Sequence, residues 1–162
     1  MLSRLELRRQ LLHMGFGIFL VMMLYFELFT VVHLLIILVL GIVLSQLCAR
    51  FHVPIASWVM DHFERQEFRK KFPGKGPILF VLGSIIVIFL FPKNIALASM
   101  MILSLGDGVS HIFGKLLSRR TYTYLKSIEG TVLGIAFSFL GALFFVNIVP
   151  ALVGSILSMV FE

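Results

Sequence analysis

The chain consists of long apolar stretches separated by short polar segments. The apolar stretches are 11–26, 28–49, 78–91, 95–113, 131–149 and 151–161. Because a hydrocarbon core about 30 Å thick is crossed by about 20 helical residues, 28–49, 95–113 and 131–149 are each predicted to be a membrane-spanning helix. Residues 11–49 form a long apolar tract interrupted near Glu27, which predicts a helical hairpin with Glu27 at its tip. We therefore predict an all-α fold, a polytopic membrane helix bundle of five to six transmembrane helices.

The composition agrees with this pattern. Hydrophobic residues make up 59% of the chain and charged residues 14%, and the mean hydropathy is +1.04. A soluble domain carries about 25% charged residues, so a soluble fold is excluded. We expect a single integral membrane domain over residues 1–162.

The basic residues gather in three polar segments. The chain has 14 Lys and Arg against 8 Asp and Glu, a formal net charge of +6. Thirteen of the 14 lie in these segments: Arg4, Arg8, Arg9, Arg50, Arg65, Arg69, Lys70, Lys71, Lys75, Lys115, Arg119, Arg120 and Lys126. If the spans alternate in direction, all three segments share one side of the membrane and Lys93 lies on the other. By the positive-inside rule the basic side is cytoplasmic and holds the N-terminus.

This distribution of charge also bears on partners and location. It favours anionic headgroups or phosphates as partners over a nucleic acid, for which the chain has no separate basic domain. We expect an integral membrane protein, of the inner membrane in a prokaryote, with its functional site facing the cytoplasm. The single Cys48 excludes an intramolecular disulfide.

One acidic residue, Asp107, lies between Gly106 and Gly108 inside the apolar stretch 95–113. A carboxylate at membrane depth costs several kcal/mol unless it has a partner or a function. The flanking glycines allow a phosphate, a metal or another backbone to approach closely, and carboxylate oxygens are ligands that Mg²⁺ prefers. The alternative is an aspartate paired with a buried Arg or Lys for structure. His111 lies on the same helix face, but this spacing is common by chance, so we assign His111 a structural role.

The segment from Lys126 to Thr131 places a cation, a hydroxyl and an acid just before an apolar stretch. Unpaired N–H groups at the start of a helix form a natural phosphate site. The alternative is a capping box, with Ser127 and Gly130 at the cap and first-turn positions. The residues alone leave both interpretations open. Small residues then recur every four positions in this stretch, a pattern typical of close helix packing, at Gly130, Gly134, Ser138 and Ala142.

The order of these motifs resembles the polyprenol kinase family, which includes dolichol kinases, phytol kinases and CTP-dependent diacylglycerol kinases. The resemblance covers nearly the whole chain. It rests on Glu6-Leu7-Arg8-Arg9-Gln10-Leu11-Leu12-His13, Pro73-Gly74-Lys75-Gly76-Pro77, Gly106-Asp107-Gly108 with Gly114-Lys115, and Lys126-Ser127-Ile128-Glu129-Gly130-Thr131. Gln10 departs from the family, which usually has lysine at this position.

The resemblance implies an enzyme, a CTP-dependent lipid kinase that transfers the γ-phosphate of CTP to a membrane lipid hydroxyl of the polyprenol, phytol or diacylglycerol type. Phosphoryl transfer requires positioning and neutralisation of charge, which Mg²⁺ and basic side chains supply. Asp107, Glu129 and Lys126 are the expected catalytic residues, with Asp107 and Glu129 as metal ligands. The expected nucleotide-binding and phosphate-binding residues are Arg9, Lys75, Gly106, Gly108, Gly114, Lys115, Ser127, Gly130 and Thr131.

Family members commonly continue into an acidic, Asn-containing loop and another span, whereas this chain ends at Glu162. We therefore expect either a truncated form or a site completed by a partner. Two other functions fit the same residues. A phosphatidate cytidylyltransferase carries a similar Gly-Asp and Lys-x-x-Glu-Gly arrangement, and in a small membrane transporter or structural subunit Asp107 would bind an ion or a proton.

Overall fold

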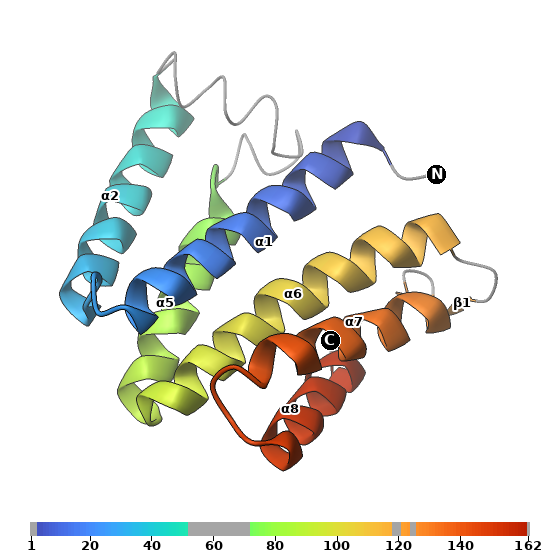
Figure 1. Cartoon of the computed structure of the whole chain (residues 1–162). Coiled ribbons are helices and arrows are strands. Elements are labelled where there is room, and N and C mark those ends of the chain that lie inside the picture. Colours follow the sequence, from blue (N-terminus) through green and yellow to red (C-terminus); the bar gives the residue numbers. More distant parts are fainter. Residues whose placement is uncertain (1–2, 52–71, 118–120, 124–125, 162) are drawn as a thin grey trace.

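The computed structural model describes residues 3–51, 72–117, 121–123 and 126–161 (Figure 1). Within these residues it contains six helices and one short pair of strands. The helices are α1 (Arg4–Tyr25), α2 (Val31–Arg50), α5 (Lys75–Leu90), α6 (Lys93–Leu117), α7 (Ile128–Ala142) and α8 (Ile148–Phe161), and the antiparallel strands are β1 (Thr121–Thr123) and β2 (Lys126–Ser127). The prediction of an all-α fold is confirmed, with the strand pair as a minor addition.

Three of the described helices, α1, α2 and α6, are long and apolar enough to cross a membrane, and α5, α7 and α8 are shorter apolar helices. The predicted break near Glu27 is confirmed, because α1 ends at Tyr25 and α2 begins at Val31. The prediction of a single helix over 131–149 is wrong. That helix ends at Ala142, whose carbonyl accepts the N–H groups of Phe145 and Val146 in a tight turn. Pro150 then lies in the first turn of α8, where its missing N–H costs no hydrogen bond.

Helix α1 packs antiparallel against α6 (Figure 1). Partners from the start of α1 therefore lie near the end of α6. Glu6 contacts Lys115, His13 and Met14 contact Asp107 and Gly108, Gly17 contacts Ser104, and Glu27, just beyond α1, contacts Lys93. The middle of this interface is apolar, with Leu20 and Val21 fully buried in a cluster that includes Leu97 and Met100. This apolar section lies between the pair of Glu27 with Lys93 at one end and the contacts of His13 with Asp107 and of Glu6 with Lys115 on its other side.

Helices α6 and α7 approach most closely at glycines. A Cβ atom at Gly130 would lie 2.6 Å from the Cα atom of Gly114 and 2.6 Å from the carbonyl oxygen of Ser110. The predicted stripe of small residues is confirmed, since Gly130, Gly134, Ser138 and Ala142 are all buried. Small residues at these positions allow the two backbones to come within contact distance.

Helix α8 covers the next side of α6 and α7. The side chain of Met159 lies against both Gly106 and Gly134, and Ala151 is buried in a cluster with Ala98 and Ile102. Helix α6 therefore forms the centre of the fold, with α1 on one face and α7 and α8 on the others.

An exposed ion pair fastens the turn between α1 and α2 to the start of α6. Lys93 Nζ lies 2.8 Å from Glu27 Oε1 and 3.5 Å from the carbonyl oxygen of Tyr25. Glu27 adopts a left-handed conformation with φ of 61°. The hydrogen bond from Lys93, together with its positive charge, holds the pKa of Glu27 below its ordinary value. Lys93, which the sequence set apart from the other cations, thus has a structural partner.

We predict that Gly130→Ala destabilises the protein. The added methyl group must displace backbone atoms of α6, and overpacking of this kind costs about 1–3 kcal/mol, against a gain of at most about 1 kcal/mol from the helix propensity of alanine. Thermal unfolding in detergent checks this. Gly83→Ala is the control, because no atom in the described part of the chain lies within 4 Å of its added Cβ atom. Equal melting temperatures for the two variants would contradict the observed helix crossing.

We predict that Lys93→Met raises the pKa of Glu27 toward its ordinary value of 4.5. Because the pKa of Glu27 is lowered in the folded protein, the pair contributes stability above the ordinary pKa. This contribution is lost as the pH falls through the lowered pKa. A carboxyl-carbon NMR titration of Glu27 in detergent measures the shift. An identical titration curve in the wild type and in Lys93→Met would show that the pair does not form.

Candidate functional site

Two stripes of ionisable side chains face each other where α1 begins and α6 ends. Residues three, four or seven positions apart lie on one side of a helix, so each stripe is a local consequence of sequence spacing. The antiparallel packing of the helices then brings the two stripes into contact. The stripe on α1 consists of Glu6, Arg9 and His13, and the stripe on α6 consists of Asp107, His111 and Lys115.

Asp107 lies between two imidazole rings. Its Oδ1 atom is 3.1 Å from His111 Nε2, one turn along α6, and its Oδ2 atom is 3.7 Å from His13 Nε2 on α1. Phe80 of α5 supports the His13 ring edge-on, with 5.4 Å between the ring centroids. The Asp107 side chain is 25% exposed. A partly open carboxylate held between two histidines can accept a proton from a ligand or bind a cation.

Nearer the C-terminal end of α6 than Asp107, the buried carboxylate of Glu6 on α1 contacts two cations. Arg9 Nη2 lies 2.6 Å from Glu6 Oε1, and Lys115 Nζ lies 3.7 Å from the same oxygen. The Glu6 side chain is 5% exposed, whereas those of Arg9 and Lys115 are 32% and 37% exposed. The structure thus brings two predicted phosphate-binding residues together, and both remain accessible to a ligand.

The glycines predicted for the site are positions of helix packing. Gly108 faces the side chain of Met14, and Gly106 faces Met159. Gly114 and Gly130 form the contact between α6 and α7. From the sequence, the glycines beside Asp107 could admit a phosphate, a metal or another backbone. In the structure, neighbouring helices pack closely at these glycines.

Ser127 caps helix α7. Its hydroxyl accepts the backbone N–H of Gly130 at 3.1 Å, and the hydroxyl of Thr131 donates to the carbonyl oxygen of Ser127 at 3.1 Å. The capping role of Ser127 is therefore confirmed. Glu129, in the first turn, has a buried Oε2 atom without a hydrogen-bond partner in the described structure. The backbone of Lys126 belongs to β2, but the placement of its side chain lies outside what the structure describes.

Two further predicted residues, Lys75 and Glu129, lie on helices other than α1 and α6. Lys75 begins α5 and is exposed. Glu129 lies in the first turn of α7, and α7 packs against Ser110 and Gly114 of α6, three and seven positions from Asp107. Among the residues with described positions, no group of three or more His, Cys, Asp or Glu side chains is placed to hold a metal ion.

Sequence reasoning missed two members of the site, His13 and Glu6. His13 and Glu6 both belong to the first motif of the chain. His13 follows Arg9 by four residues, so His13 and Arg9 share one face of the helix. This spacing was the available signal, but it does not reveal which helix the face contacts. His111 does face Asp107, as their spacing predicts.

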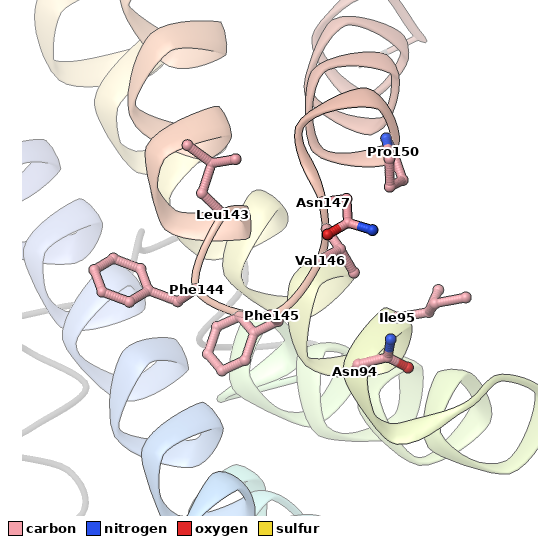
Figure 2. Close-up of a pocket in the computed structure, with 8 residues that line it drawn as sticks. All are labelled: Asn94, Ile95, Leu143, Phe144, Phe145, Val146, Asn147 and Pro150. Atoms are coloured by element: carbon pink, nitrogen blue, oxygen red, sulfur yellow. The ribbon is translucent and has the colours of Figure 1, made fainter.

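A separate hollow of about 400 Å³ lies at the opposite end of α6 (Figure 2). Its lining carries no ionisable side chain and consists of Asn94, Ile95, Leu143, Phe144, Phe145, Val146, Asn147 and Pro150. Asn94 is about 13 residues from Asp107 along α6, or ~20 Å at helical rise. The hollow is therefore not part of the ionisable site.

Comparisons with known proteins give one relative and no function. No protein-family model matches the chain, and no solved structure matches it. The chain is 29% identical over 127 residues to the uncharacterized protein MJ1137 of Methanocaldococcus jannaschii. The matched region covers 77% of this chain and 64% of the relative, so the chain spans less than two thirds of the relative's length.

We predict that cysteines at positions 14 and 108 form a disulfide, which tests the register that joins His13 to Asp107. A Cβ atom at Gly108 would lie 3.6 Å from the Cβ atom of Met14, within the range of about 3.5–4.5 Å found in disulfides. Met14→Cys also removes the Sδ atom that crowds Gly108 and replaces the crowding Cγ atom with the sulfur that forms the bond. The double variant, made in a Cys48→Ser background, is oxidised in detergent and its linked peptides are identified by mass spectrometry.

Gly15→Cys combined with Gly108→Cys, in a Met14→Ala background that relieves the same crowding, is the matched control for this cross-link. Among the described residues nothing lies within 4 Å of a Cβ atom at Gly15, so this pair is expected to stay reduced. Equal cross-linking of the two pairs would overturn the register.

Proposed function

We propose that this protein is a membrane-embedded, CTP-dependent lipid-alcohol kinase. In this proposal it transfers the γ-phosphate of CTP to a lipid hydroxyl of the polyprenol, phytol or diacylglycerol type. The observation that carries the proposal is that the Asp107 carboxylate lies on the same α1–α6 interface as two accessible cations, Arg9 and Lys115, which are nearer the end of α6. Phosphoryl transfer depends mainly on positioning and on neutralising phosphate charge, and this group of side chains supplies both.

We further propose six membrane spans with a cytoplasmic N-terminus. The antiparallel pairing of α1 with α6, and the reversals at Glu27 and after Ala142, support alternating directions. The helices α5, α7 and α8 have 16, 15 and 14 residues, or about 21–24 Å at helical rise. They are shorter than a typical hydrocarbon core, so in this topology the bilayer thins locally or flanking residues complete these spans.

In this topology the basic ends of the helices face the cytoplasm. Lys115 lies about 8 residues from Asp107, or ~12 Å along α6. The lipid alcohol would enter laterally from the inner leaflet, while the nucleotide would approach from the cytoplasm. The hydroxyl and the phosphates would then meet at the level of Asp107.

Within this mechanism the side chains have separable roles. Arg9 and Lys115 would bind phosphate oxygens through charge-assisted hydrogen bonds. Asp107, oriented by His13 and His111, would accept the proton of the lipid hydroxyl or contribute a metal ligand.

The residues present also fit a magnesium ion. Asp107 offers a partly open carboxylate, and Glu129 offers a buried carboxylate oxygen without a hydrogen-bond partner in the described structure. Mg²⁺ is usually bound through one or two carboxylates, with water and substrate phosphates completing its coordination. When bound, the ion would neutralise charge on the triphosphate.

Isotope-labelled CTP tests the reaction. Purified protein in detergent, given a lipid-alcohol panel, is expected to transfer label to lipid from γ-labelled CTP and not from α-labelled CTP. Asp107→Asn should abolish this transfer and the increase in melting temperature produced by nucleotide. Glu27→Gln, which removes a carboxylate at the opposite end of the bundle, should retain both.

Two outcomes would reject the kinase. Transfer from α-labelled CTP alone would identify a cytidylyltransferase. Unchanged nucleotide binding and turnover in Asp107→Asn would remove the central assignment of Asp107.

A further inference from the structure

Glu6 is a buried acid that lies outside the set of residues expected for phosphoryl transfer. It is in the first turn of α1, where its backbone N–H donates to the Ser3 hydroxyl at 3.2 Å. Its side chain is 5% exposed and lies against both Arg9 and Lys115. A buried carboxylate is costly unless it is paired, so this position requires an explanation in terms of its partners.

The partners come from two different helices. Arg9 is one turn along α1 from Glu6, and Lys115 belongs to the last turn of α6. Both side-chain nitrogens lie within 3.7 Å of the same Glu6 oxygen. Two cations held this close to one oxygen atom would repel each other if that oxygen carried no negative charge. Glu6 therefore fixes their spacing across the helix interface.

This arrangement leaves binding capacity on both cations. A guanidinium group has five N–H donors and an ammonium group has three, so one carboxylate oxygen does not exhaust either group. About a third of each side chain is exposed. Two neighbouring, accessible cations match the adjacent phosphates of a polyphosphate chain.

We propose that Glu6 is a positioning residue that holds Arg9 and Lys115 together as a binding pair for the polyphosphate of a nucleotide. The identity of the nucleotide rests on the proposed kinase function, whereas the binding of polyphosphate does not. Glu6 acts through its two cations and does not contact the reacting atoms. Its removal is therefore expected to weaken nucleotide binding more than it slows the chemical step.

The test compares Glu6→Gln with Glu27→Gln in two measurements. Glutamine keeps the size of the side chain but removes the charge that holds the cations. Loss of charge-assisted positioning should raise KM for CTP about tenfold, with a smaller effect on kcat. The increase in melting temperature caused by inorganic tripolyphosphate should also be lost in Glu6→Gln. Glu27 pairs with Lys93 at the other end of the bundle. The Glu27→Gln variant should therefore behave as wild type in both measurements.

A double-mutant cycle separates positioning from a general loss of structure. If Glu6 acts through Lys115, Glu6→Gln should weaken tripolyphosphate binding less in a Lys115→Met background than in the wild type. If Glu6→Gln does not fold, Glu6→Asp keeps the charge but withdraws it by one methylene group. The Asp variant should then show weaker tripolyphosphate binding than the wild type.

The outcomes distinguish this proposal from the kinase assignment. Stabilisation of the wild type by tripolyphosphate, lost in Glu6→Gln, supports the positioning role even if no lipid is phosphorylated. Overturning results are wild-type tripolyphosphate binding in Glu6→Gln, wild-type binding in Glu6→Asp where the Gln variant does not fold, additive effects in the cycle, or no stabilisation of the wild type. Kinase activity with any of these results would leave the proposed reaction in place without this binding pair.

Discussion

The antiparallel contact between α1 and α6 is the interaction on which the rest of the structure depends. Along this interface an apolar section separates the pair of Glu27 with Lys93 from the ionisable contacts made by His13 and Glu6. Apolar packing at Leu20 and Val21 fixes the register, and the register determines which polar groups meet. A shift of one helical turn would separate His13 from Asp107 and Glu6 from Lys115. Buried charges would then lose their partners, which costs free energy.

Helix α6 is also packed from several sides at once. Gly106 and Gly114 admit α8 and α7, while Gly108 admits α1. The glycines next to Asp107 therefore lie where neighbouring helices pack closely around α6. The ion pairs at the two ends of α6 differ in burial. The pair formed by Glu27 and Lys93 is largely exposed and restrains a turn, whereas Glu6 is buried among accessible cations.

Much of the fold follows from local pattern. The apolar stretches 28–49 and 95–113 correspond closely to α2 and α6, because sustained hydrophobicity over this length favours a helix. The turn after Ala142 was missed, since Phe145 and Val146 continue the apolar pattern while their N–H groups turn back to Ala142. Hydropathy does not register a reversal made by apolar residues. The capping role of Ser127 was one of two interpretations, and the choice required the observed contact with the Gly130 N–H.

The sequence by itself determined the helical character of the chain, the separation of its charges, and the position of Asp107 as an acid in an apolar stretch. It also placed Arg9 and His13, and separately Asp107 and Lys115, in local motifs. Only the tertiary structure decided that these motifs face each other. Helical periodicity specifies which residues share one face of a helix, but the partner of that face depends on packing between segments distant in sequence, which no local repeat encodes.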